Sequence, residues 1–124
     1  ADVRLRRRRF ILRKQRIEAA EKVAEKLFEA ENAVDQAIIR AAELAASIPT
    51  ARTEAGLSAV VGQDALDEVV KTLPALVAGR KALIETHNQL DRTKTEIGLR
   101  EVAFGTPNGK PPAHAILRAV EEAA

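Results

Sequence analysis

The residues with the clearest chemical potential are the cations near the N-terminus. Residues 1–16 hold eight basic side chains and one acid, so they carry +7, whereas the other 108 residues hold 12 basic and 17 acidic side chains and carry −5. Guanidinium groups bind phosphates and carboxylates through paired hydrogen bonds, and cations release counterions from polyanions. The sequence therefore predicts a site for an anionic partner. This basic cluster consists of Arg4, Arg6, Arg7, Arg8, Arg9, Arg13, Lys14 and Arg16.

Three kinds of anionic partner fit the basic cluster: nucleic acid, an acidic protein surface and membrane headgroups. Proteins that read single strands usually add aromatic side chains for stacking, and here Phe10 is the one available. The run Phe10–Leu12 combines with the arginines as in an interfacial helix, but three large apolar residues give only marginal membrane affinity. A membrane partner is therefore disfavoured. The competing interpretation is a solvated helix start that keeps the protein soluble.

His87 is the next candidate, because it lies four residues before Asp91 and shares a helix face with it. Such a pair could ligate a metal, but His114 is the only other imidazole and the chain has no cysteine. A di-metal helical bundle needs a Glu-x-x-His motif, and Ile84 occupies the position of that Glu. A phosphotransfer role is a third-ranked alternative. The favoured interpretation is a polar residue on a helix seam, with no metal and no cofactor.

Catalytic motifs are otherwise missing from the sequence. No spacing suggests a Ser/His/Asp set, and the segment 105–110 ends in Gly-Lys without the spacing, the following Ser/Thr or the preceding strand of a phosphate-binding loop. We therefore expect no enzymatic activity and no small-molecule substrate.

The element that must position these residues is a long helix with one continuous apolar stripe. The composition favours helices over sheets, since charged residues make up 31% of the chain and aromatic residues 2%. Alternating spacings of three and four indicate a helix packed along its length against another helix. The stripe consists of Ala20, Val23, Leu27, Ala30, Val34, Ala37, Ala41, Leu44 and Ile48.

A second stripe follows at heptad spacing, formed by Leu76, Leu83, Leu90, Ile97 and Phe104. Polar residues take the positions that complete its heptads, namely Arg80, His87, Lys94 and Glu101. Their stems can cover apolar surface while their polar ends reach water.

The sequence predicts one all-α domain. Its segments are a basic N-terminal arm (1–9) that frays until an anion neutralises it, a first helix (10–47) stopped by Pro49, a connector (48–64), a second helix (65–104) with a break near Pro74, a turn (105–112) and a short helix (113–124). Asp64 is the expected N-cap of the second helix. We expect the two long helices to form an antiparallel, coiled-coil-like hairpin, which self-association completes into a bundle.

The predicted function is a non-enzymatic interaction or structural protein, with a homo-oligomer or a helical protein as the assembly partner. The alternative is a nucleic-acid-binding protein that contacts phosphates through its Arg-rich N-terminus. The short apolar stretch near the N-terminus and the absence of cysteine predict a cytoplasmic location. The predicted assembly interface consists of Val23, Leu27, Val34, Leu44, Leu83, Leu90 and Ile97.

Overall fold

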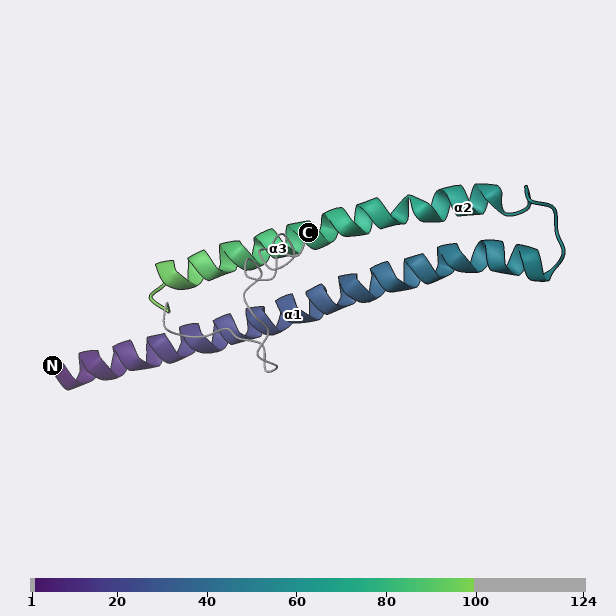
Figure 1. Ribbon diagram of the computed structural model, residues 1–124. Helices are drawn as coiled ribbons and strands as arrows, with labels where there is room; N and C mark the ends of the chain where they lie inside the picture. The colour runs from purple at the N-terminus through teal and green to yellow at the C-terminus, as the bar shows by residue number, and fades with distance from the viewer. Residues whose placement is uncertain (1, 100–124) are drawn as a thin grey trace, which may run out of the picture. The chain divides into compact units, whose positions relative to one another are not determined.

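The computed structural model describes residues 2–99 and contains three helices in that range (Figure 1). Helix α1 spans Asp2–Glu54, α2 spans Gln63–Val70 and α3 spans Thr72–Glu96. No strand occurs within residues 2–99, so the predicted all-α class is confirmed for this part of the chain. The predicted turn over 105–112, the predicted helix over 113–124, Glu101 and Phe104 lie outside the described residues.

Helix α1 begins earlier than the sequence indicated. The predicted start at residue 10 is wrong, because residues 2–9 are already part of α1. Arginine is a good helix former, and Asp2 at the positive end of the helix dipole offsets part of the repulsion among the cations. Asp2 also pairs with Arg6 one turn later, at 2.8 Å between Oδ2 and Nη2.

Pro49 does not end the first helix, so the predicted stop at residue 47 is also wrong. Helix α1 continues through Pro49 to Glu54. Proline has no N–H, so the carbonyl of Ala45, four residues earlier, loses its helical donor, while neighbouring hydroxyl groups hydrogen-bond to other carbonyls of these turns. Ser47 Oγ donates to the Leu44 carbonyl at 2.7 Å, and Thr50 Oγ1 donates to the Ala46 carbonyl at 3.0 Å. Because Ala45 is only half-buried, water can hydrogen-bond to its carbonyl, so the helix tolerates the proline there.

Glycines in the left-handed region end α1 and α3. Gly98 has a φ of 80°, its N–H donates to the Thr95 carbonyl at 3.1 Å, and the N–H of Leu99 donates to the Lys94 carbonyl at 2.9 Å. This is a Schellman motif, which uses glycine because other residues are strained there. Gly56 repeats the pattern after α1. The second helix therefore ends at Glu96, and the predicted extension to residue 104 is wrong.

The start of α2 also differs from expectation. Its N-cap is Gly62 in the left-handed region and makes no side-chain cap, so the assignment of Asp64 as N-cap is wrong. Asp64 instead lies in the first turn, where its carboxylate favours the positive end of the helix dipole. Residues 55–62 form turns between α1 and α2, shorter than the predicted connector. The predicted break near Pro74 is confirmed: it falls at Lys71, and Pro74 lies in the first turn of α3.

The chain divides into two units, each with its own contacts. Unit 1 contains Ala1–Glu29 and Ile84–Ala124, and unit 2 contains Ala30–Leu83. In unit 1, Arg13 reaches the Gly98 carbonyl and Phe28 meets His87, so the two helical segments pass in opposite directions. In unit 2, an ion pair of 2.7 Å joins Asp35 Oδ1 of α1 to Arg80 Nε of α3.

The packed side of α1 follows the predicted stripe except at Val23 and Leu44. Leu27 is buried and Val34 half-buried, as the stripe predicts. Leu44, however, is 56% exposed, whereas Ala45 beside it is half-buried. Val23 is likewise exposed and Ala24 half-buried. Small alanines on the packed side allow the backbones to approach closely, which leaves the larger side chains beside the seam.

Two glycines, one inside α3 and one just after it, give predictions of opposite sign. Replacement of Gly98 by Ala should lower the free energy of unfolding by about 1–2 kcal/mol, because a side chain is strained at positive φ. Replacement of Gly79 by Ala should raise it by about 0.5–1 kcal/mol, because Gly79 lies inside the helix with open space around the added carbon. Urea unfolding followed by circular dichroism measures both changes. Equal effects of the two substitutions would contradict the helix end at Glu96.

Candidate functional site

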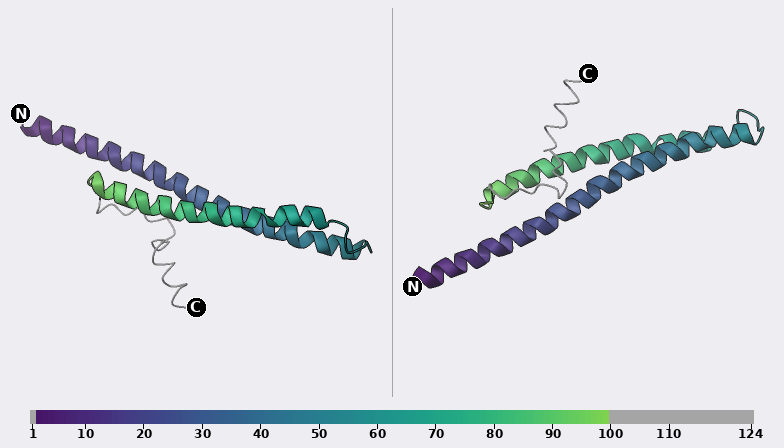
Figure 2. Two further views of the ribbon diagram at one scale, coloured as in Figure 1. Left: turned by 90° about the horizontal axis from the view of Figure 1, so that it is seen from above. Right: turned by 60° about the horizontal axis from the view of Figure 1, so that its bottom comes forward.

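The basic cluster lies on one helical rod. All eight of its residues belong to α1, and all eight are exposed. Figures 1 and 2 show the first turns of α1 extending past the end of α3 within unit 1. The contact between Arg13 Nη1 and the Gly98 carbonyl, 3.1 Å long, marks where α3 ends along α1. Residues 2–12 therefore project beyond this contact as a cationic helix.

The cations of this rod point in several directions. With 3.6 residues per turn, Arg4 and Arg8 lie on one side of the helix, and Arg6 and Arg13 lie opposite them. Exposed apolar side chains such as Leu5 and Phe10 lie among these cations on different sides, so the helix has no single basic face and no single apolar face. Such an arrangement can hold an anionic partner that contacts it from more than one direction.

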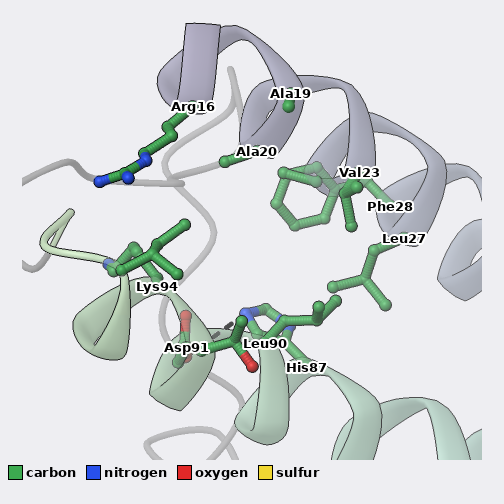
Figure 3. A pocket seen from close by; sticks show the side chains of 13 residues that line it. Arg16, Ala19, Ala20, Val23, Leu27, Phe28, His87, Leu90, Asp91 and Lys94 are labelled. Atoms are coloured by element: carbon green, nitrogen blue, oxygen red, sulfur yellow. Dashed lines mark ion pairs between the residues drawn. The ribbon is translucent and has the colours of Figure 1, made fainter. Parts of the chain in front are cut away.

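An apolar groove lies beside the rod in unit 1, between α1 and the C-terminal half of α3. It has a volume of about 270 Å³. Figure 3 shows side chains from the two helices pointing into it from opposite sides. Arg16 and Lys94 carry its cationic rim, and Asp91 adds one carboxylate. Its apolar lining consists of Ala19, Ala20, Val23, Ala24, Leu27, Phe28, Leu90 and Ile97.

The groove brings together four of the seven predicted assembly residues. Val23 and Leu27 line it from α1, Leu90 lines it from α3, and Ile97, the residue that follows α3, lines it as well. Val23 is 49% exposed and Ile97 is 39% exposed, so both remain accessible to another molecule.

The other three predicted assembly residues belong to unit 2 and do not line this groove. Val34 and Leu83 are half-buried there, and Leu44 is exposed. The structure thus separates the predicted set into a group that shares one groove and a group that does not.

His87 is a packed seam residue in this structure. Its ring meets Phe28 edge-to-face, with centroids 6.1 Å apart and planes at 64°. Nε2 lies 3.9 Å from Asp91 Oδ2, and the side chain is 17% exposed. No group of three or more metal-ligating side chains occurs within residues 2–99. These contacts support the interpretation of His87 as a polar residue on the seam.

The groove itself was not evident from the sequence. The stripe positions predict which residues are apolar, but they do not indicate that Phe28 packs on His87 or that Gly98 ends α3 beside Arg13. Gly98 was the signal available, since a helix that stops there frees the first turns of α1.

Comparison with known proteins gives no relative: no family model, no curated protein and no solved structure matches this chain. Among the described helices, none contains an apolar stretch of the length and hydropathy needed to span a bilayer. Arguments about function therefore depend on the groove and on the basic cluster.

Proposed function

We propose that this protein is a non-enzymatic helical interaction protein that self-associates through the apolar groove and holds a polyanion with the basic cluster. The observation that carries the proposal is the groove, which collects Val23, Leu27, Leu90 and Ile97 on one surface. Within residues 2–99, only Leu27 and Leu99 are buried. Association would remove more apolar surface from water and so stabilise the helices.

The favoured occupant of the groove is a helix from a second copy of the chain. A symmetric interface places the same surface on both partners, so it must complement itself. The rim of the groove carries both signs of charge, with Arg16 and Lys94 against Asp91. The alanines of its lining leave room for a helix backbone to approach closely. The predicted hairpin and bundle architecture is part of this proposal.

A polyanion is the favoured second partner, because the eight clustered cations lie on a helix with exposed side chains. The alternative function, nucleic-acid binding through phosphates, uses the same residues. The spread of cations around the helix favours it, since nucleic-acid backbones can present phosphates on two sides of a bound helix.

A charge placed in the groove tests the assembly proposal. The Val23→Asp and Ile97→Asp variants should each lower the mass of the particle in solution while helicity is retained, because these side chains are partly exposed. The matched control is Ile39→Asp, since Ile39 is 46% exposed in unit 2 and does not line the groove. Light scattering gives the mass, and circular dichroism gives the helicity.

Two outcomes would count against the assembly proposal. Groove variants that keep the mass of the unmodified protein would show that the groove is not the interface. A control variant that dissociates as readily as the groove variants would show that any added acid disrupts the particle, with no role for the groove in particular.

A further inference from the structure

Four exposed side chains share one face of the helical rod that carries the basic cluster. Residues spaced by four, three and four along a helix share one face, and Arg4, Arg8, Ile11 and Gln15 have this spacing. All four are exposed. This face lies opposite Arg13, whose guanidinium contacts the end of α3. We call these four residues the outer face.

Cations flank the outer face on both sides. Arg7 and Lys14 lie about 80° round the helix from its centre on one side, and Arg9 and Arg16 lie about 120° round on the other, where Arg16 lines the groove. The outer face therefore presents two guanidiniums, an amide and an apolar side chain, with a pair of cations to each side. Phosphates that contacted both flanks would have to come from two directions.

The major groove of B-form DNA has this geometry. It is about 12 Å wide, it admits an α-helix, and phosphates of both strands border it. Base edges at its floor accept hydrogen bonds from arginine at guanine and from glutamine at adenine, and the thymine methyl group takes apolar contacts. The outer face carries each of these side-chain types, in Arg4, Arg8, Ile11 and Gln15.

Two other anionic partners fit less well. A membrane surface needs a single apolar face, but Leu5 and Leu12 lie on one side of the helix and Val3 and Phe10 lie almost opposite them. A-form RNA duplexes have a deep, narrow major groove that side chains cannot read. Neither partner would use the outer face together with both flanks.

We infer that the first turns of α1 bind in the major groove of duplex DNA. In this arrangement the outer face contacts base edges, while Arg7 and Lys14 contact phosphates of one strand and Arg9 contacts phosphates of the other. The inference rests on the proposed role of the basic cluster in holding a polyanion. The inference identifies the polyanion as duplex DNA and assigns base contacts to Arg4 and Arg8.

The test compares guanine with 7-deazaguanine in a guanine-rich duplex of about 20 base pairs, long enough to hold the roughly 16 Å that residues 4–15 span. The replacement removes the N7 acceptor from the major groove and leaves charge and base pairing unchanged. The full-length protein should bind the 7-deazaguanine duplex about tenfold more weakly, as expected from loss of a paired arginine contact. Fluorescence anisotropy with labelled duplexes gives the affinities.

Two double variants, each of which loses two positive charges, distinguish residues that contact bases from residues that contact phosphates. The Arg4→Ala/Arg8→Ala protein should bind the two duplexes equally, because the base contacts are gone. The Arg7→Ala/Lys14→Ala protein should bind both more weakly and keep its preference for guanine, because it loses phosphate contacts alone.

Equal binding of the two duplexes by the unmodified protein would overturn the inference, as would equal or tighter binding of an RNA duplex. Heparin, a polyanion without grooves, separates this failure from failure of the proposed function. Binding to heparin with no preference between the duplexes overturns groove docking alone. Failure to bind heparin and DNA at low salt overturns both the groove docking and the proposed binding of a polyanion. Binding to anionic lipid vesicles without any binding to DNA also overturns both.

Discussion

Replacement of Leu27 by Ala should lower the free energy of unfolding by about 2–5 kcal/mol, the usual cost of a truncated buried leucine. Leu27 is 8% exposed, packs on the seam of unit 1 and lines the groove. The shortened side chain leaves a cavity, and few other buried residues can compensate, since Leu99 is the only other buried one within residues 2–99. Thermal or urea unfolding monitored by circular dichroism measures the loss.

The matched control is Leu44→Ala, which makes the same chemical change at another position of the predicted stripe. Leu44 is 56% exposed, so its truncation should cost less than about 1 kcal/mol. The comparison tests which side of α1 is packed. A Leu44→Ala variant that loses as much stability as Leu27→Ala would contradict the assignment of Leu27 as a packed residue and Leu44 as an exposed one.

Replacement of Arg6, Arg7, Arg8 and Arg9 by Gln should weaken the binding of polyanions and lower its dependence on salt. Each phosphate contact contributes about 0.9 to the slope of log affinity against log salt for duplex DNA, so loss of the two phosphate contacts assigned to Arg7 and Arg9 should reduce that slope by about 1.8. Glutamine is also a good helix former, so α1 should persist. Anisotropy titrations at several salt concentrations give the slope.

Four cations outside the basic cluster provide the control, and their replacement by Gln changes the net charge equally, from +2 to −2. Three of them already pair with glutamates at 3.1 Å or less. The hydrogen bond and the charge of Glu29, for example, raise the pKa of Lys26 above its usual value. The control protein should keep most of the slope. A matching loss in both proteins would mean that net charge, not the cluster, determines binding. The control residues are Lys22, Lys26, Arg40 and Lys71.

The helical class followed directly from the sequence, but the ends of the helices did not. Pro49 predicted a stop, but α1 continues to Glu54 and leaves only the Ala45 carbonyl without its helical donor at that point. The predicted second helix ran through Gly98 to residue 104, whereas the positive φ of Gly98 ends α3. Both errors arise because a residue's local effect depends on which backbone groups its neighbours satisfy.

The choice between neighbouring apolar positions also lay beyond the sequence pattern. Val23 and Ala24, like Leu44 and Ala45, are both apolar, so a spacing of three or four fits either. In the structure Ala24 and Ala45 are the more buried of each pair, because small side chains allow the helices to approach closely. The polar residues of the second stripe were better predicted, since Arg80 pairs with Asp35 as a seam residue can.

Among the candidate sites, the basic cluster was apparent from charge alone, but the arrangement of its side chains around the helix was not. Only the continuous helix from Asp2 shows that Arg4, Arg8, Ile11 and Gln15 share a face. The groove required Leu27, Leu90 and Ile97 to be placed beside one another, which depends on the register between the helices. Contacts between distant residues, such as Arg13 with Gly98, fix that register.

The most direct test of self-association through the groove is the solution mass of the full chain, measured by light scattering over a range of concentrations. We expect a discrete multiple of 13.4 kDa, the mass of one chain. This mass should persist at moderate salt, since apolar contacts are not screened. A helical particle of 13.4 kDa at every concentration would contradict the proposed assembly.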